Sequence, residues 1–169
     1  MKGDAKSRVM GLVLFMAGLL LTGPALAAAD AGEQKQQSAI AAQLDGFHQA
    51  AANADFEDYF KRFSKDGVFL GTDATERWDV DAFKAFTRPY FSQGKGWTYV
   101  PRNRTIVVHG DVAWFDELLD NEAYGECRGT GVLVREGGQW KIAQYNLHFP
   151  VPNALARSIT KMIKDSRAE

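Results

Sequence analysis

The sequence predicts an α+β domain in which three helices precede an antiparallel sheet and a further helix follows it. Apolar residues recur every three or four positions through residues 38–88, which is the period of amphipathic helices. From Trp97 onward the period changes to two, which is the period of strands. Two glycine-containing turns, residues 109–111 and 136–138, divide this second region into two hairpins.

The first two helices are predicted over residues 38–53 and 56–63. Asp55 suits the N-cap of the second helix, because its carboxylate can accept a hydrogen bond from a free backbone N–H of the first turn. Asp66-Gly67 is a turn signal that ends this helix. His48 lies beside the apolar stripe of the first helix and reads as a boundary residue, since no second histidine follows at metal-ligand spacing. The two stripes consist of Ile40, Leu44, Phe47, Ala51, Phe56, Tyr59, Phe60 and Phe63.

Two further helices have equally clear starts. Asp79 caps the third helix, and Pro89 biases Arg88 away from helical angles, so that helix should end or kink there. Its core side is formed by Val80, Phe83 and Phe86. Pro152-Asn153 begins the C-terminal helix. One side of that helix is apolar and can pack on the domain or on a partner; it carries Leu155, Ile159, Met162 and Ile163.

The strand region begins with a short buried strand, residues 68–70, followed by a polar loop at 71–78. The first hairpin joins residues 97–108 to 112–119 through Gly110-Asp111. This turn sets a register of cross-strand neighbours, which pairs Arg104 with Glu117, Thr105 with Asp116 and Val107 with Trp114.

The two neighbouring acidic residues of this hairpin, Asp116 and Glu117, are expected to lie on opposite faces of the sheet. The Arg104–Glu117 pair is expected to face solvent, where such pairs contribute roughly 0 to 1 kcal/mol. Asp116 shares a face with Trp114 and Leu118. An acid on an aromatic sheet face has a raised pKa and could serve as a general base.

The second hairpin joins residues 126–135 to 139–149. With a three-residue loop, one face grades from an apolar end to a polar end, as in a small-molecule pocket with polar groups at its mouth. A loop shorter by one residue would change these partners. The expected pairs are Val134 with Trp140, Val132 with Ile142, Thr130 with Gln144, Arg128 with Asn146 and Glu126 with His148.

The N-terminus has the pattern of a signal peptide. Basic residues precede an apolar run, residues 9–21, and Ala25-Leu26-Ala27 provides the small residues of a cleavage site. Thirteen apolar residues are too few for a membrane anchor, which needs about 20. We therefore expect residues 1–27 to be removed on export to the periplasm or the medium, residues 28–37 to be a flexible leader and residues 38–169 to form the domain.

Charge and cysteine content narrow the classes of function. Without residues 1–27 the formal net charge is −3, because three basic residues and one acidic residue are lost. This weak acidity argues against a nucleic-acid partner. Cys127 is the only cysteine, so no intrachain disulfide can form, and a buried inert thiol is expected. No motif for a nucleotide, haem, flavin or zinc is present, so neither a cofactor nor a metal is expected.

Three segments resemble a known family. GTDATERW at 71–78, VAWFDELLDN at 112–121 and GECRGTGVLVREGGQWKIAQYNLHFPVPN at 125–153 are similar to the SnoaL-like branch of the nuclear transport factor 2 (NTF2-like) superfamily. The resemblance covers nearly all of the chain after the signal peptide. It implies a cone in which a strongly curved antiparallel sheet wraps around the N-terminal helices and leaves a pocket open at one end.

The resemblance also implies candidate site residues. Catalytic relatives use an acid inside the cone with polar partners, roles for which Asp116 and His148 are the catalytic candidates here. The histidine often found near the end of the last strand is replaced by Asn146, which departs from that pattern. The loop at 71–78 commonly lies at the pocket rim, although it could equally be a packing loop. The expected ligand-binding residues are Glu76, Trp78, Trp97, Trp114, Arg128, Gln144 and Asn146.

Three functions remain open, because the superfamily serves many roles. The first is a homodimeric domain that binds a small, largely apolar molecule, with Arg128 holding a polar or anionic group. The second is a metal-independent acid/base enzyme of the isomerase, dehydratase or cyclase type, in which Asp116 takes a proton next to a carbonyl. The third is a dimerisation module that buries Tyr145, Leu147 and Phe149 on the outer sheet face. A buried ion pair of Arg128 with Glu126 or Asp116 is the purely structural alternative.

Overall fold

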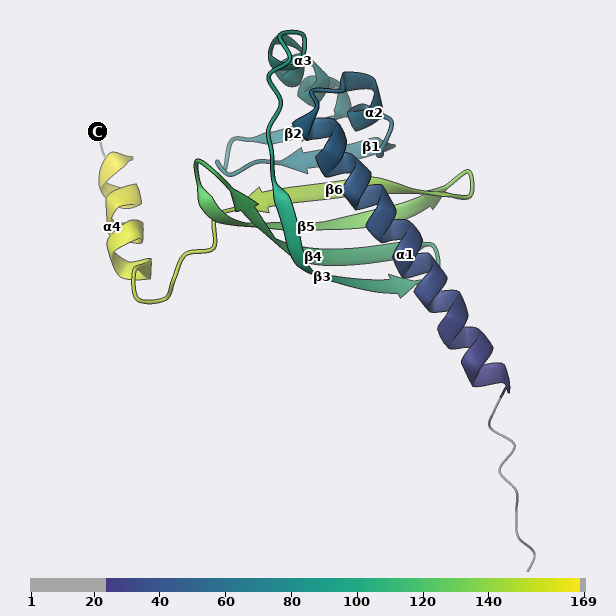
Figure 1. Ribbon diagram of the computed structural model, residues 1–169. Coiled ribbons are helices and arrows are strands. Elements are labelled where there is room, and N and C mark those ends of the chain that lie inside the picture. Colours follow the sequence, from purple (N-terminus) through teal and green to yellow (C-terminus); the bar gives the residue numbers. More distant parts are fainter. Residues whose placement is uncertain (1–23, 168–169) are drawn as a thin grey trace, which may run out of the picture.

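The chain folds into a curved six-stranded sheet with four helices over residues 24–167, which this computed structural model describes (Figure 1). The predicted α+β class is confirmed. The helices are α1 (Pro24–Ala52), α2 (Phe56–Phe60), α3 (Val80–Phe91) and α4 (Ala156–Ser166). The strands are β1 (Phe63–Leu70), β2 (Arg77–Asp79), β3 (Val100–His109), β4 (Val112–Asn121), β5 (Gly125–Glu136) and β6 (Gln139–His148). The predicted signal peptide lies outside the described residues except for its last four.

The sheet has the strand order β2-β1-β6-β5-β4-β3. All neighbours are antiparallel except β1 and β6, which run parallel. The sequence does not predict this parallel pair, because it joins strands that lie far apart along the chain. It also misses β2, which forms when Trp78 pairs with Phe69 and turns part of the expected loop into an edge strand.

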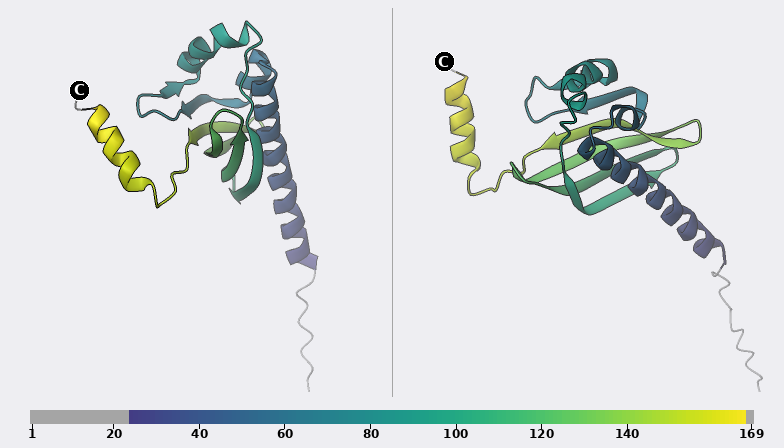
Figure 2. Two further views of the ribbon diagram at one scale, coloured as in Figure 1. Left: turned by 60° about the vertical axis from the view of Figure 1, so that its left-hand side comes forward. Right: turned by 45° about the horizontal axis from the view of Figure 1, so that its top comes forward.

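Helix α1 crosses one face of the sheet, which we call the inner face, while α2 and α3 lie at the β1–β2 end (Figures 1 and 2). The apolar stripe of α1 is buried against the inner face, as predicted. This packing forms the hydrophobic core of the domain. The sheet contributes Phe69, Phe115, Leu133, Ile142 and Tyr145 to it.

The segment expected to be a flexible leader, residues 28–37, is helical and belongs to α1. Its residues are mostly strong helix formers such as alanine, glutamine and lysine. Two glutamines also connect it to the sheet. Gln37 donates a hydrogen bond to the Ile106 carbonyl (3.3 Å), and Gln36 accepts one from Arg135 (2.9 Å).

Helix α2 is shorter than predicted, and Asp66-Gly67 lies inside β1 instead of ending a helix. The N-cap role of Asp55 is confirmed by the hydrogen bond that its carboxylate accepts from the Asp58 N–H. The register between β1 and β6 shifts between Phe63 and Val68, so this part of β1 bulges. Gly67 is needed there because an added Cβ would lie 2.9 Å from the Ile142 carbonyl oxygen.

The β5–β6 register differs from the expected one for two reasons. The turn is only Gly137-Gly138, both with positive φ (56° and 80°), and Glu136 pairs with Gln139. A bulge then shifts the register between Val132 and Leu133, opposite Ala143. Trp140, Ile142, Tyr145 and Leu147 therefore face the core.

The bulge reverses the faces of the second half of β6. Gln144, Asn146 and His148 lie on the outer face, and the expectation that they share an inner face with Trp140 is wrong. Tyr145 and Leu147 are likewise not available for an outer dimer face, because they pack into the core. A one-residue slip moves every following side chain to the opposite face, which explains both corrections.

The β3–β4 hairpin has the predicted register from its turn as far as Thr105, with Thr105 opposite Asp116 and Val107 opposite Trp114. The register then shifts between Arg102 and Thr105, so Arg104 and Glu117 are not regular backbone partners. The faces of the hairpin are the reverse of those expected. The alternate residues Ala113, Phe115, Glu117 and Leu119 are buried on the inner face, which leaves Trp114 and Asp116 exposed on the outer face.

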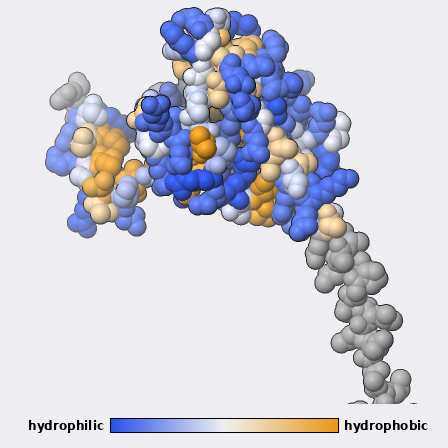
Figure 3. Space-filling model, viewed as in Figure 1, coloured by the Kyte–Doolittle hydropathy of each residue, from blue (hydrophilic) through white to orange (hydrophobic). Residues whose placement is uncertain are grey.

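Helix α4 stands apart from the sheet and buries none of its side chains (Figures 1 and 3). Its exposed apolar residues form the hydrophobic area visible on that helix in Figure 3; they include Leu155, Met162 and Ile163. Within residues 24–167 no helix combines the length and apolarity that a membrane span requires.

Candidate functional site

A pocket opens between α3, the β1–β2 loop and the ends of the strands next to it. Its volume is about 320 Å³, which is at the lower end of the range of small-molecule sites. We call it the aromatic pocket, because aromatic rings form most of its wall. It is lined by Phe69, Gly71, Thr72, Glu76, Trp78, Phe83, Phe86, Tyr90, Trp97, Tyr99, Tyr124, Leu147 and Phe149.

The rings on the α3 side hold one another in place. Trp78 stacks against both Phe83 and Phe86, with ring centroids 5.5 Å and 4.8 Å away, and the two phenylalanines also contact each other. Across the mouth, Tyr124 and Phe149 form a second pair at 5.1 Å. Such contacts add stability beyond area burial, so the wall is preorganised. The pairing of Trp78 with Phe69 places the segment that was expected to be a loop, residues 71–78, against α3 and so shapes the pocket.

Behind the aromatic pocket lies an inner void of about 20 Å³, which has room for one water molecule. The two spaces share the side chains of Phe69, Trp97, Tyr99 and Leu147. The inner void is also lined by His48, Tyr59 and Tyr145. The Tyr59 hydroxyl is buried and has no hydrogen-bond partner among the described residues, and burial raises its pKa well above the ordinary value.

A buried polar network lies next to the inner void. Glu117 is fully buried at its centre and accepts a hydrogen bond from the Tyr145 hydroxyl (3.1 Å). One carboxylate oxygen lies 2.7 Å from His48 Nε2, and the other accepts from Arg104 Nε at 2.7 Å. Arg104 also donates to Asp45 at the surface (2.7 Å). The predicted Arg104–Glu117 pair thus exists, but it is buried rather than exposed.

The charges of the network are mutually stabilising. Burial alone would raise the pKa of Glu117, but the hydrogen bond from His48 and the charges of His48 and Arg104 outweigh it, so the pKa is lowered. Glu117 is therefore a carboxylate at neutral pH. A carboxylate can only accept, so His48 Nε2 carries a proton toward it, and in the neutral ring Nδ1 is left as the acceptor.

Three predicted ligand-binding residues line the aromatic pocket: Glu76, Trp78 and Trp97. The β1–β2 loop and strand β2 place the first two, and the segment before β3 places the third. The resemblance left this loop as either a pocket rim or a packing loop; Glu76 and Trp78 line the pocket, and Trp78 also packs on Phe83.

The remaining predicted site residues lie on the outer face of the sheet and do not reach the aromatic pocket. Asp116 and Trp114 alternate with the buried residues of β4, and the Trp114 side chain is 48% exposed. Arg128 is exposed on β5 opposite His148. Burial and the charge of Arg128 lower the pKa of His148. The β6 bulge places Gln144 and Asn146 on this same face.

The residues of the buried polar network were not among the site residues predicted from the sequence. Glu117 was assigned to solvent, although its strand period also places it on the face of Phe115 and Leu119, which is a usable signal. His48 lies beside the apolar stripe of α1, and nothing local connects it to a glutamate 69 residues away. Only the crossing of α1 over β4 brings them together.

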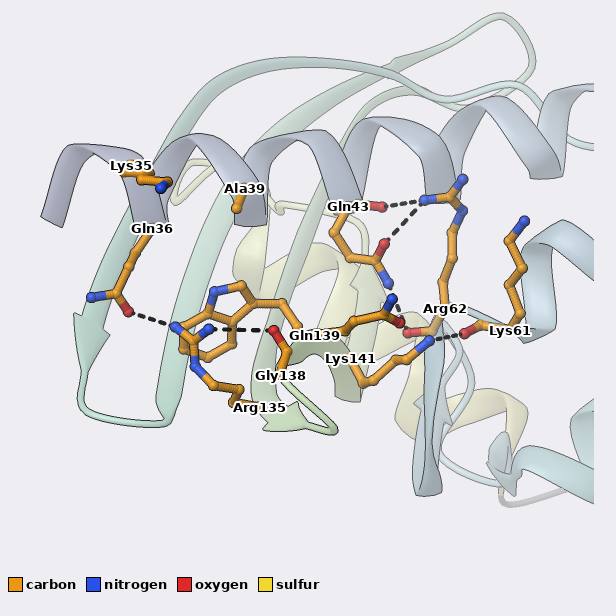
Figure 4. A pocket seen from close by; sticks show the side chains of 11 residues that line it. Lys35, Gln36, Ala39, Gln43, Lys61, Arg62, Arg135, Gly138, Gln139 and Lys141 are labelled. Carbon is orange, nitrogen blue, oxygen red and sulfur yellow. Dashed lines mark hydrogen bonds between the residues drawn. The ribbon is translucent and has the colours of Figure 1, made fainter. Parts of the chain in front are cut away.

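A second, larger groove lies at the other end of α1, between this helix and the β5–β6 turn (Figure 4). Its volume is about 790 Å³, and it contains cations but no acidic lining residue. Arg62 is held by Asp58 and Gln43, and Arg135 lies over the Trp140 ring at 4.5 Å while donating to Gln36. The arginines thus serve the packing of α1 onto the sheet.

The single cysteine, Cys127, lines neither the aromatic pocket nor the inner void. Cys127 is buried on β5, as predicted, and burial raises the pKa of its thiol. Among residues 24–167, no three His, Cys, Asp or Glu side chains are grouped as ligands for a metal ion.

The model of the SnoaL-like domain family matches residues 40–152. The chain belongs to this family. The match includes α1 from its buried part onward and the whole sheet, and therefore both the aromatic pocket and the buried polar network. No functionally curated protein matches the chain.

Solved structures with this fold share little sequence with the SnoaL-like chain. A protein of unknown function from Mycobacterium tuberculosis has a TM-score of 0.64 at 18% identity, covering 78% of this chain and 81% of its own. An NTF2-like protein of unknown function from Pseudomonas putida has a TM-score of 0.60 at 20% identity, covering 73% and 90%. An NTF2-family structure from Streptomyces avermitilis, named as a proposed dehydratase, has a TM-score of 0.60 at 12% identity, covering 71% and 99%. At these identities the comparison shows the fold alone.

Proposed function

We propose that this SnoaL-like protein is an exported domain that binds a small, largely apolar molecule in its aromatic pocket. The observation that carries the proposal is the pocket itself, an open cavity of about 320 Å³ with a stacked aromatic wall. Large rings held open to solvent favour association with an apolar molecule, because burial of their surface releases water. Arg128 has no part in this site, so an anionic ligand group is not included in the proposal.

Replacement of Phe86 by alanine is expected to weaken binding of the neutral dye Nile red at least fivefold. Phe86 is 41% exposed, stacks on Trp78 and lines the pocket, so its removal takes away contact area while leaving the core in place. The measurement is a fluorescence titration. Trp114→Ala is the matched control, because Trp114 is a similarly exposed aromatic on the outer face. Equal loss in both variants, or no binding to the wild type, would contradict the proposal.

Export and dimerisation are part of the same proposal. The signal-peptide pattern supports export. The outer face presents Val107 beside its cross-strand partner Trp114, both exposed, which supports a homodimer through this face. Intact masses of the protein purified from its host, recorded under native and denaturing conditions, test all three points. We expect loss of residues 1–27, a dimer and a retained small molecule.

A second candidate function, a metal-independent acid/base enzyme, is favoured by one specific observation. The His48–Glu117 hydrogen bond orients an imidazole in the way that general bases are oriented. In this proposal His48 takes the role of general base that the sequence analysis gave to Asp116, because Asp116 lies on the outer face. His48 adjoins the inner void and also a groove of about 320 Å³ formed with residues 98–101. A substrate would have to reach His48 from one of these two sides.

The enzyme proposal predicts proton exchange that depends on His48. We expect the wild type to accelerate deuterium incorporation next to the carbonyl of at least one compound in a panel of cyclic ketones, followed by NMR. His48→Gln should abolish this acceleration, since glutamine cannot accept the proton. His109→Gln, at the exposed β3–β4 turn, is the control. Exchange that persists in His48→Gln would exclude His48 as the base.

A further inference from the structure

The aromatic pocket has an unusual charge pattern. Of its thirteen lining residues nine are aromatic, and Glu76 is the only charged one. No lysine or arginine is among them. The pocket therefore offers a ligand one negative charge and the electron-rich faces of several rings, and it offers no group that could neutralise an anion.

The Glu76 carboxylate is held at the rim by its own loop. Its Oε2 accepts a hydrogen bond from the Asp73 backbone N–H (3.2 Å), and its backbone carbonyl accepts one from the Gly71 N–H (2.8 Å). Gly71 makes room for it, because a Cβ at this position would overlap the carboxylate. Within residues 24–167 no cationic side chain forms a salt bridge with Glu76. The charge thus remains available to a ligand.

Exposed aromatic rings line the same pocket as this carboxylate. On α3, Phe86 stacks on Trp78, and Tyr90 lies tilted against Phe86 with a centroid distance of 5.6 Å. Tyr124 of the β4–β5 loop and Phe149 after β6 line the same pocket as a second ring pair, and both are exposed. A cation placed among aromatic faces is attracted by their quadrupoles, and a nearby carboxylate adds to that attraction.

We propose that the ligand of the aromatic pocket is a small organic cation that carries an alkylated ammonium group. The ammonium group lies among the rings at the mouth beside Glu76, and the apolar part of the ligand extends toward Trp97 and Leu147. This inference rests on the proposed binding function and names its ligand class. It replaces the anionic group expected from Arg128, which lies on the other face of the sheet.

The test compares choline with 3,3-dimethylbutan-1-ol, in which a carbon atom replaces the charged nitrogen. Isothermal titration calorimetry of the full mature chain is expected to give at least tenfold tighter binding for choline. In Glu76→Gln this ratio should fall at least fivefold, because the shape is kept and the charge is removed. Gly71→Ala should act in the same direction by displacing the carboxylate. Glu57→Gln, an exposed acid on α2, is the control.

The outcomes separate the ligand class from the binding function. Tighter choline binding that depends on Glu76 supports the inference. Equal or tighter binding of the alcohol overturns the inference while leaving a small-molecule pocket. Failure of choline to bind or to displace Nile red from the wild type also overturns it. Only failure of Nile red itself to bind in a Phe86-dependent way removes the underlying function.

Discussion

Replacement of Glu117 by alanine is expected to lower the free energy of unfolding by about 3–5 kcal/mol, the usual cost of removing one member of a buried ion pair. Glu117 is fully buried and is contacted by Arg104, His48 and Tyr145. Without it, Arg104 keeps a largely buried charge and the Tyr145 hydroxyl loses its acceptor. Urea unfolding followed by circular dichroism measures the change.

The neighbouring acid on the same strand provides the control. Asp116 is exposed on the outer face, so Asp116→Ala should change stability by no more than about 0.5 kcal/mol. If the two variants lose the same stability, Glu117 does not hold the inner face together. The comparison also tests which face of β4 is buried, because the sequence predicted Asp116 on the buried face and Glu117 on the exposed one.

Glu117 is also expected to make the folded protein less stable at acidic pH. The pKa of folded Glu117 lies below its ordinary value of 4.5, so the stability that its ionisation provides is complete above that value. This stability is lost as the pH falls through the lowered pKa, because protonation removes the attraction to Arg104. In Glu117→Gln the slope of stability against pH below about 4.5 should therefore be smaller than in the wild type.

The second large effect is expected from Gly131→Ala on β5. An added Cβ would overlap the backbone carbonyl oxygen of Gln144 and lie 2.7 Å from a ring carbon of Phe115. Neither atom belongs to a flexible chain end, so strands must shift, at a cost of about 1–3 kcal/mol or more. Gly32→Ala on α1 is the control, since nothing lies within 4 Å of its added Cβ. Thermal unfolding of both variants tests the prediction, and a wild-type melting temperature for Gly131→Ala would contradict it.

The sequence predicts those parts of the fold that depend on local signals. The β3–β4 register was correct from the turn as far as Thr105 because Gly110 fixes the turn, and its positive φ of 60° confirms the reason. The β5–β6 register failed because two adjacent glycines left the loop length open. The alternation of apolar and polar residues from Trp140 to Phe149 gives no sign of the bulge at Ala143. On β6 the side chains of Trp140 and Ile142 lie on the expected face, and those beyond the bulge do not. On β5 the expected face is wrong from the turn onward, because Leu133 and not Val132 lies opposite Ile142.

For the candidate site as well, the sequence indicates residues with a local signal and not the contacts that only the fold creates. Glu76, Trp78 and Trp97 were candidates because of a loop that resembles the family and an aromatic residue before the strands, and all three line one pocket. The His48–Glu117 contact was not, because α1 and β4 meet only through the three-dimensional packing of the domain. Strand period alone also cannot say which of two alternating sets faces the core when both contain apolar residues. On β4 one set has Trp114 and Leu118, and the other has Phe115 and Leu119.

The parallel pairing of β1 with β6 determines when the fold can be completed. Strand β1 needs a neighbour that is the last strand along the chain, so residues 63–70 leave the ribosome long before their partner exists. Contacts between distant segments form slowly, since the intervening chain must first be ordered. Until β6 arrives, the β1–β2 hairpin has an unsatisfied strand edge that can pair with another chain. The first strand of the chain thus completes its pairing only after the last strand has been synthesised.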